Sequence, residues 1–368
     1  MEQEKSKRCT KFAILAAGEG SRLAQEGVEL PKPLVKINGE AMIDRLIRIF
    51  NGCGAEEIFI ITNNLTPLTQ NHLRDLQNSA LAPKNGIKLI VKTTPSSMHS
   101  FYELRQIMGD GKFCLTTVDT IFREAEFKEY IDAWSSSGDD GMMAVTDYID
   151  DEKPLYIGTD SNLGITGFYD TEAQKYISGG IYCLSETSFP VIDKCISEGQ
   201  SRMRNFQRQL VKDGLRLKAY PFSKILDVDH ASDIEKAEEF TAMKEGISYT
   251  SKVTVSDSLL AQAMGSGDMP VFATPAMMAL MENAAMNCVA PYMQIGMTTV
   301  GGHIESSHLA PSPLDAEITA TATLTKIDGK KLFFDIKAEM DGKLIGEGKH
   351  LRFIVPREKF LSKIYPEK

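Results

Sequence analysis

The stretch LAAGEGSRLAQEGVELPKPLVKINGE, residues 15–40, decides how this chain folds, because it joins the end of an apolar run to a glycine-rich turn. An apolar strand that enters such a turn presents successive backbone N–H groups to a phosphate. Gly18 and Gly20 allow the backbone to approach the phosphate closely, and Ser21 and Arg22 add side-chain donors. The stretch therefore predicts a phosphate-binding loop at the carboxyl end of a strand.

A second feature lies ten residues beyond the turn, where Pro31 and Pro33 enclose Lys32. Each proline fixes its own φ angle, so we expect the lysine in an extended segment where its charge can neutralise phosphate oxygens. The glycine turn alone also fits part of a Rossmann fingerprint, but GEGSRL lacks the third glycine in the required place. The turn and the enclosed lysine together favour phosphate binding over an ordinary surface turn.

Apolar runs alternate with helical patterns through the first 245 residues. In MIDRLIRIF, residues 42–50, apolar side chains recur at helical spacing. Repeated strand–helix–strand order is typical of an α/β fold, so we expect a Rossmann-like domain with a mixed, mostly parallel sheet at residues 1–245. The runs predicted to be buried strands are Phe12–Ala16, Ile58–Thr62, Ile87–Val91, Phe113–Val118 and Met142–Val145.

Through the glycine-rich loop, Arg22 and the lysine of Pro31-Lys32-Pro33, residues 11–245 resemble the sugar-phosphate nucleotidyltransferase family. The resemblance implies Mg²⁺-dependent transfer of a nucleotidyl group from an NTP to a phosphorylated acceptor, expected to be a sugar 1-phosphate, with release of pyrophosphate. It also implies catalytic roles for Arg22 and Lys32. The positions implied to bind substrate in this loop are Ala16, Gly18, Gly20 and Ser21.

Two aspartates are implied to hold the Mg²⁺, because nucleotidyl transfer needs a cation to offset the charge of the triphosphate. Asp119 follows the apolar run Phe113–Val118, where the family carries its first metal ligand. The family's second ligand comes late, just before a short helix. We favour Asp229 for that place, with Asp227 as the alternative, and note that His230 stands where the family usually carries Thr or Ser.

Three further positions are implied to bind substrate. Ser97 lies with Thr93 and Ser100 in KTTPSSMHS, a stretch that resembles the segment in contact with the nucleotide base. Lys153 resembles the family's substrate-phosphate lysine. Gly180, in ISGGIY, resembles the start of the strand that lines the substrate pocket.

The sequence changes character at about residue 247, so we place a domain boundary near Glu245-Gly246 and a second domain at residues 246–368. Pro275 opens a helical pattern, and Thr274 is expected to be its N-cap. Only strands are predicted after this helix, which makes the second domain α+β rather than a continuation of the first.

The strands of the second domain are predicted from strict alternation of apolar and polar residues. AEITATATLT and KLFFDIKAEM each place their apolar side chains on one face. Asp328-Gly329 and Asp341-Gly342 are turn signals between such strands. The pattern is typical of an antiparallel meander packed against one long helix.

From about Ser248 to Val355 the chain resembles fluoroacetyl-CoA thioesterases and their hotdog-fold relatives, in VFATPAMMALMENAAMNCVAPYM, VGGHIESSHLAPSPL and DGKKLFFDIKAEMDGKLIGEGKHLRFIV. The resemblance implies acyl-CoA hydrolysis by a catalytic trio of Thr274, Glu282 and His308. Glu282 would act as nucleophile or general base, His308 as proton carrier and Thr274 as the hydrogen-bond partner of the carboxylate. Gly301 would contact the thioester, and pairing of hotdog domains implies a homodimer.

The acyl group stays open at this point. Pro275, Asn283 and His303 stand at positions around the acyl pocket where the fluoroacetyl enzyme carries other residues. Fluoroacetate itself is therefore not the expected acyl group.

Composition excludes several classes of protein. A net charge of −9 does not suit a nucleic-acid binder, which usually carries a basic face. The polar start of the N-terminal MEQEKSKRCTKFAILAAG carries two glutamates, and its apolar run is too short for a signal peptide; no apolar run approaches the length of a membrane span. The six cysteines are scattered without metal-ligand spacing, so we expect reduced thiols in a cytoplasmic protein.

Three functional hypotheses follow. The first is a bifunctional enzyme with a nucleotidyltransferase site and a thioesterase site. The second is a nucleotidyltransferase whose hotdog domain only dimerises or binds acyl groups. In the third, which Arg22, Lys32 and Asp119 argue against, the first domain is a ligand sensor without turnover.

Overall fold

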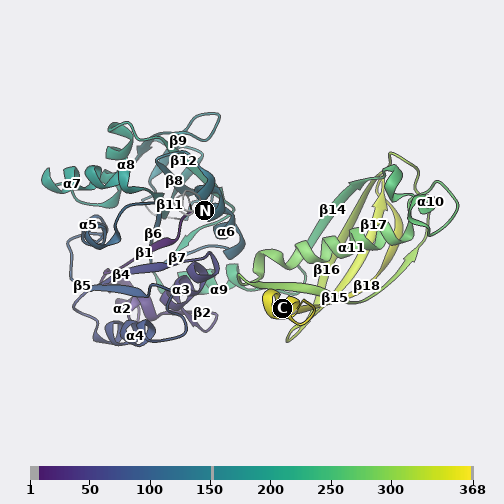
Figure 1. The fold of residues 1–368 in the computed structure, drawn as a ribbon, viewed down its shortest axis with the longest axis horizontal. Coiled ribbons are helices and arrows are strands. Elements are labelled where there is room, and N and C mark those ends of the chain that lie inside the picture. The colour runs from purple at the N-terminus through teal and green to yellow at the C-terminus, as the bar shows by residue number, and fades with distance from the viewer. Residues whose placement is uncertain (1–7, 151–152, 366–368) are drawn as a thin grey trace. The chain divides into compact units, whose positions relative to one another are not determined.

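The computed structural model describes residues 8–150 and 153–365. The chain divides into two compact units, Met1–Thr241 and Ala242–Lys368, whose ribbons are drawn in Figure 1. Residues 1–7, which begin the segment excluded above as a signal peptide, lie outside the described residues.

The second unit begins slightly before Glu245-Gly246, because the residues around this point pack on it. Met243 and Ile247 are partly buried against its core. The Glu245 carboxylate accepts a hydrogen bond from the backbone N–H of Ile327 at 2.8 Å. These contacts tie the joining segment to the second unit.

A nine-stranded mixed sheet forms the frame of the first unit. Its parallel part consists, in spatial order, of β6 (Phe113–Thr117), β1 (Lys11–Ala16), β4 (Glu57–Thr62) and β5 (Ile87–Val91). β1, β4 and β6 are buried apolar runs, as the sequence predicts, whereas the prediction of a buried strand at Ile87–Val91 is wrong in part, because β5 lies at the edge of the sheet and only Ile87 is buried. Because they are parallel, their carboxyl ends meet at one edge of the sheet, where the glycine-rich turn and Asp119 follow β1 and β6.

The antiparallel part of this sheet lies on the other side of β6. β11 (Tyr176–Leu184) runs antiparallel to β6, and β8 (Gly141–Thr146) and β9 (Tyr156–Thr159) pair with β11. β10 (Ile165–Tyr169) and β12 (Leu217–Phe222) complete it. The sheet therefore confirms the predicted mixed α/β class.

Helices cover both faces of the sheet, because the strands bury side chains on both. One face packs on α5 (Ser97–Met108), α7 (Phe189–Ser197) and α8 (Met203–Lys212). On the other face, the Phe12 ring lies 4.6 Å from that of Phe50 in α3 (Met42–Gly52), and the Phe50 ring lies 5.7 Å from that of Phe127 in α6 (Glu124–Ser136). The helix predicted at residues 42–50 is thus confirmed as α3. The remaining elements of the unit are α2 (Ser21–Gln25), η1 (Lys32–Leu34), β2 (Lys36–Ile37), β3 (Glu40–Ala41), α4 (Pro67–Gln77), β7 (Thr120–Ile121), η2 (Glu186–Ser188), β13 (Leu226–Asp227) and α9 (Ala231–Thr241).

The second unit is a five-stranded antiparallel sheet packed on one helix, α11 (Thr274–Val289). Met277, Met281 and Ala284 on α11 are fully buried against the apolar faces of the strands. This is the predicted α+β hotdog arrangement. The strands, in spatial order, are β14 (Ser248–Thr254), β16 (Glu317–Asp328), β17 (Lys331–Met340), β18 (Lys343–Pro356) and β15 (Met297–His308). Short helical segments occur at η3 (Asp257–Leu259), α10 (Ala261–Met264) and η4 (Ala290–Tyr292).

Two predictions about this unit are wrong. Thr274 is the first residue of α11 and Ala273 is its N-cap, because the Thr274 hydroxyl bonds to His308 instead of a backbone N–H of its own helix. A short helix, α12 (Arg357–Ser362), follows the last strand where only strands were expected. The predicted turn at Asp341-Gly342 is confirmed, since both residues have positive φ, as a two-residue hairpin of type I′ requires.

Among the described residues, every helix is too short or too polar to cross a lipid bilayer.

Candidate functional site

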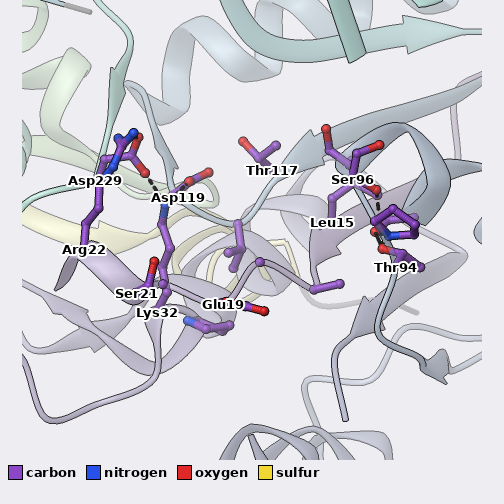
Figure 2. A pocket seen from close by; sticks show the side chains of 18 residues that line it. Leu15, Glu19, Ser21, Arg22, Lys32, Thr94, Ser96, Thr117, Asp119 and Asp229 are labelled. Atoms are coloured by element: carbon purple, nitrogen blue, oxygen red, sulfur yellow. Dashed lines mark hydrogen bonds and ion pairs between the residues drawn. The ribbon is translucent and has the colours of Figure 1, made fainter. Parts of the chain in front are cut away.

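A cavity of about 500 Å³ lies where β1 enters the glycine-rich turn. Gly18, Gly20, Ser21 and Arg22 line it, as Figure 2 shows for the labelled side chains among them. Gly20 has a φ of +64°, and a Cβ atom there would lie 3.0 Å from the Cβ of Lys32. A glycine is therefore needed at this position both for the left-handed backbone and for the close approach of the lysine segment.

Lys32 joins two aspartates at one end of this cavity. Its Nζ lies 2.6 Å from Asp229 Oδ1 and also contacts Asp119 Oδ2. Only 11% of the lysine side chain is exposed. Burial alone would lower the pKa of Lys32, but the two carboxylates outweigh it and raise that pKa above its usual range.

The two aspartates are the metal ligands expected from the sequence, and they come from distant segments. Asp119 follows β6, and its Oδ1 is buried without a hydrogen-bond partner in the described part of the chain. Asp229 Oδ2 also lies 3.3 Å from Nη1 of Arg22. Asp227, the alternative ligand, lines a neighbouring cavity. No group of three His, Cys, Asp or Glu side chains arranged for a metal occurs within residues 8–150 and 153–365. A divalent cation held by two carboxylates would take its other oxygens from a nucleotide, as Mg²⁺ usually does.

Hydroxyl groups line the opposite end of the first cavity. Thr94, Ser96, Ser97 and Ser100 face it, and Ser96 is the N-cap of α5. Ala16, which was predicted to bind substrate, is buried and does not line this cavity. Its neighbours Leu15 and Ala17 line the cavity instead.

A second cavity of about 490 Å³ shares Arg22 and Asp229 with the first. Lys153 lines it, as does Gly179. Gly180 itself does not line this cavity. It lies in a bulge of β11 with a φ of +71°, and a Cβ atom there would lie 3.2 Å from the hydroxyl oxygen of Thr120. Further lining residues with hydroxyl or charged side chains are Thr146, Tyr148, Asp150, Ser178, Asp233 and Lys236.

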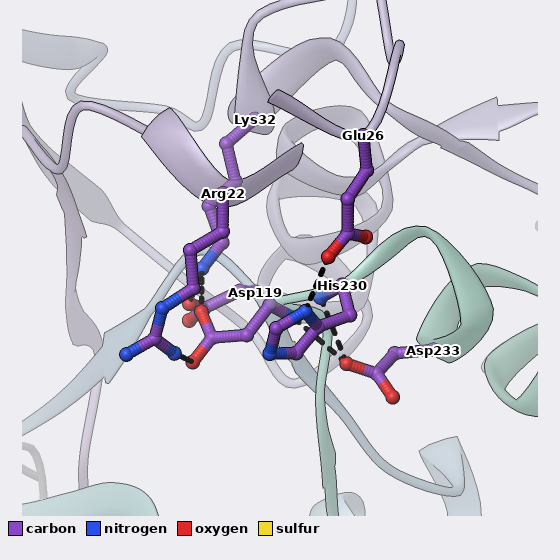
Figure 3. A network of polar contacts seen from close by, with 7 residues as sticks. Arg22, Glu26, Lys32, Asp119, His230 and Asp233 are labelled. Carbon is purple, nitrogen blue, oxygen red and sulfur yellow. Dashed lines mark hydrogen bonds and ion pairs between the residues drawn. The ribbon is translucent and has the colours of Figure 1, made fainter. Parts of the chain in front are cut away.

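A polar network at the entrance to α9 was not expected from the sequence (Figure 3). His230 Nδ1 lies 2.6 Å from Glu26 Oε1, and Glu26 Oε2 accepts a hydrogen bond from the Ala231 backbone at 2.6 Å. Asp233 Oδ2 accepts hydrogen bonds from the backbone N–H groups of Asp229 and His230. The bond to Glu26 raises the pKa of His230.

In the second unit, the predicted trio separates into two groups. The Thr274 hydroxyl lies 2.8 Å from Nδ1 of His308, at the start of α11 and the end of β15. His308 Nε2 is buried, with no hydrogen-bond partner among the described residues. Burial lowers the pKa of His308.

Glu282 belongs to the other group. Its Oε1 lies 3.5 Å from His350 Nε2 and 3.9 Å from an Arg352 nitrogen, and a Cβ atom on Gly301 would lie 2.5 Å from it. His350 donates from Nδ1 to the His303 carbonyl at 2.7 Å. Burial lowers the pKa of both His350 and Arg352. The structure therefore brings Thr274 to His308 and Glu282 to Gly301, but does not bring all three members of the trio together.

His350 and Arg352 were missed by the sequence analysis. Both are buried, in β18, between neighbours that are more exposed. Their two-residue spacing in KHLRFIV is the signal that could have found them, because it places two basic side chains on the inner face of a strand.

Comparisons with known proteins identify both units. The MobA-like NTP transferase domain matches residues 12–213, and the fluoroacetyl-CoA-specific thioesterase family matches residues 255–358. The fluoroacetyl-CoA thioesterase of Streptantibioticus cattleyicolor is 36% identical over 94 residues, which are 26% of this chain and 68% of that enzyme.

For the first unit, the bifunctional IPC transferase and DIPP synthase of Aquifex aeolicus is 24% identical over 244 residues. The match covers 63% of this chain, but the chain spans only about half of that relative's length, 52%. The inositol-1-phosphate CTP transferase of T. maritima has the same fold, with a TM-score of 0.53 at 16% identity, over 64% of this chain and 98% of its own.

Proposed function

The chain belongs to the MobA-like NTP transferase family and carries a fluoroacetyl-CoA-specific thioesterase domain, and from this premise we propose that it is a bifunctional enzyme. Its first unit transfers a nucleotidyl group from an NTP to a phosphorylated acceptor. Its second unit hydrolyses an acyl-CoA thioester. Both domain families are enzymes, which supports turnover in each unit.

One observation carries the first activity. Lys32 contacts Asp119 and Asp229 beside the glycine-rich turn, so a cation and two carboxylates converge where a triphosphate would lie. A lysine poised there can move from the carboxylates to phosphate oxygens when a nucleotide enters. This arrangement is unexpected for a surface turn or a ligand sensor.

The reaction is a substitution at the α-phosphorus of the NTP. An oxygen of the acceptor phosphate forms the new P–O bond, the bond to the β-phosphate oxygen breaks, and pyrophosphate leaves. Backbone N–H groups of the turn at Gly18 and Gly20 hold the leaving phosphates, and Lys32 and Arg22 neutralise charge in the transition state. Asp119 and Asp229 would hold a Mg²⁺ ion, which would supply polarisation of the phosphoryl oxygens.

The acceptor occupies the second cavity. Lys153 and Arg22 suit its phosphate, and the hydroxyls of Thr146, Tyr148 and Ser178 suit the hydroxyl groups of a sugar or another polyol. We therefore keep a sugar 1-phosphate as the first acceptor to test. The names of the two IPC and inositol-phosphate relatives add inositol 1-phosphate to the same class.

The test is a matrix of nucleoside triphosphates against sugar 1-phosphates, inositol 1-phosphate and phosphocholine, with pyrophosphate release as the readout. We expect release for at least one pair, and only with Mg²⁺ present. Absence of release across the whole matrix would contradict the proposed transferase activity.

For the thioesterase, a pair of subunits provides the site. Thr274 and Glu282 are eight residues apart on α11, about 12 Å along the helix axis. One subunit therefore holds the two groups too far apart to act on one carbonyl. β15 is an outer strand of the sheet, and antiparallel pairing of two such strands would bring the Thr274–His308 pair of one subunit toward Glu282 of the other.

In this dimer Glu282 acts as nucleophile or general base and His308 carries the proton. The full-length chain should sediment as a dimer and hydrolyse at least one member of a panel of short and medium acyl-CoA esters. A dimer that binds these esters but hydrolyses none of them would favour the alternative, a dimerisation or acyl-binding module. The six free, buried cysteines are in keeping with work in a reducing compartment such as the cytoplasm.

A further inference from the structure

We propose that Asn63 is a positioning residue for the phosphate-binding turn. Its side-chain amide holds the backbone carbonyls of Ala17 and Gly18, and so keeps the N–H groups of Gly18 and Glu19 directed into the first cavity, toward the phosphates of the NTP. The inference rests on the proposed nucleotidyltransferase function. It deepens that function, because it names the side chain that prepares the turn for the phosphates.

Asn63 lies beside the turn because of the strand that precedes it. It directly follows β4, which runs parallel to β1 and pairs with it up to Ala16 and Thr62. This register places Asn63 next to the first residues of the turn. Asn63 is only 1% exposed, and it does not line the first cavity. A buried amide needs partners for both its N–H groups and its oxygen, so the contacts of Asn63 define its role.

The orientation of this amide is fixed by its partners. Nδ2 donates to the carbonyl oxygens of Ala17 at 3.2 Å and Gly18 at 3.1 Å. Oδ1 accepts hydrogen bonds from the Leu65 backbone N–H at 2.9 Å and from the Thr66 hydroxyl at 3.0 Å. Exchanging the nitrogen and the oxygen would set an acceptor against two carbonyls and a donor against an N–H group. Only one orientation therefore satisfies all four partners.

The two carbonyl contacts determine where N–H groups of the turn point. In a trans peptide the C=O and the N–H lie on opposite sides of the bond, so the N–H groups of Gly18 and Glu19 point away from Asn63. Both residues line the first cavity, and neither N–H has a hydrogen-bond partner among the described residues. A Cβ atom on Gly18 would have no other part of the described chain within 4 Å. The space beside these donors is therefore open to a phosphate.

The turn needs such an anchor because glycine permits more than one orientation of the peptide. Gly18 has no side chain to restrict its backbone angles, so the peptide units on either side of it can rotate and turn a carbonyl toward the cavity. A carbonyl there would repel phosphate oxygens, and a donor would be lost. Donors that are held in place before the nucleotide arrives need no reorganisation during the reaction, which is how they stabilise a transition state. Asn63 thus restricts the turn where glycine leaves it free to rotate.

The experiment compares steady-state kinetics of three full-length variants with the wild type, with Mg²⁺ present throughout. N63D has nearly the same shape as the wild type but replaces the donor Nδ2 with a carboxylate oxygen, which repels both carbonyls. N63A removes the amide without adding a charge. T66A is the matched control, because the Thr66 hydroxyl contacts the other end of the same amide and lies outside both cavities.

We expect N63D to lower kcat/KM for the NTP about 10- to 100-fold, and N63A to show a smaller loss of the same kind, since preorganised donors to phosphate are lost. The inhibition constant of pyrophosphate, measured against the NTP, should rise about tenfold, because the same N–H groups hold pyrophosphate. The KM for the acceptor should stay within about twofold, since the acceptor lies in the other cavity. T66A should match the wild type, because the Leu65 N–H still holds Oδ1.

The outcomes separate the inference from the function beneath it. If the wild type turns over and both Asn63 variants keep NTP kcat/KM and pyrophosphate inhibition within about twofold of T66A, the inference is wrong and the transferase function stands. If neither variant folds, or if the KM values for NTP and acceptor rise together while the melting temperature falls, Asn63 has only a structural role and the inference is again wrong. If N63D alone does not fold, N63A decides by the same measurements. If the wild type releases no pyrophosphate with any acceptor, the proposed function fails and the inference falls with it.

Discussion

The two units assemble their polar groups in opposite ways. In the first, Lys32, Asp119 and Asp229 are separated by long stretches of sequence, yet one nitrogen contacts both carboxylates. In the second, Thr274 and Glu282 lie on one helix, yet each has its own set of partners. The polar groups of the first site meet at one nitrogen, whereas those of the second form two separate groups. Closeness in sequence is therefore a poor guide to which side chains are in contact.

The largest expected effect tests the aspartate that follows β6 in the first site. D119N should lower the rate of pyrophosphate release about 100- to 1,000-fold, because it removes a charge on which the phosphate chemistry depends. Acyl-CoA hydrolysis by the same preparation is the internal control and should not change. Transferase turnover near the wild-type rate would show that Asp119 does not hold the metal.

The next effect concerns the cation that joins the two aspartates. K32A should cost about 3 kcal/mol in kcat/KM of the transferase, the loss expected for an oriented electrostatic donor. Its melting temperature in EDTA should also fall, since the buried lysine offsets two carboxylates, and Mg²⁺ should restore part of it. K36A, at an exposed lysine nearby, is the matched control. An unchanged melting temperature in EDTA would mean that the lysine contributes nothing to stability.

A smaller effect tests the divided site of the second unit. E282Q and H308A should each be inactive alone as thioesterases. Refolded or co-expressed together, half of the dimers are mixed and each has one intact site, so about a quarter of wild-type activity should return. If mixing restores nothing although mixed dimers are detected, the groups act within one subunit and the comparison above fails.

The smallest expected effect is a shift in the pH at which thioesterase activity is lost. Burial holds the pKa of His308 below its ordinary 6.5, so the ring stays neutral to lower pH than an exposed histidine. Thioesterase kcat/KM should therefore persist at pH 6.5 and be lost only as the pH falls through the lowered pKa. Folding stability should begin to fall at higher pH, between the ordinary pKa of 6.5 and the lowered pKa, because there the unfolded chain binds the proton and the folded chain does not. An activity midpoint at or above pH 6.5 would contradict this assignment.

The sequence predicted the elements that repeat a simple physical pattern. The parallel strands were predictable because each is a short apolar run, and β16 and β17 because every second residue is apolar. The glycine turn and Lys32 were predictable because phosphate binding restricts the residue types that can serve. The resemblance of each domain to its enzyme family is confirmed by the family matches.

The contacts between distant segments were not predictable. The resemblance groups Thr274 with Glu282 and His308, but nothing in the sequence shows that Thr274 bonds to His308 while Glu282 lies beside His350. The Glu26–His230 contact spans 204 residues, and nothing in the sequence around either residue pairs one with the other. Such pairs are fixed by the fold as a whole, so a single sequence without its structure leaves them open.

The outer strand β15 has a practical consequence for protein chemistry. It is 12 residues long, and one of its sides has no strand partner among the described residues, which leaves a row of N–H and C=O groups to attract further strands. The exposed side chains of His303 and Glu305 supply polar character on that strand but do not cover its backbone. A substitution designed only to keep subunits apart should thus yield aggregates rather than a well-behaved monomer. A monomeric form will need a proline or added lysines on β15 to protect its solubility.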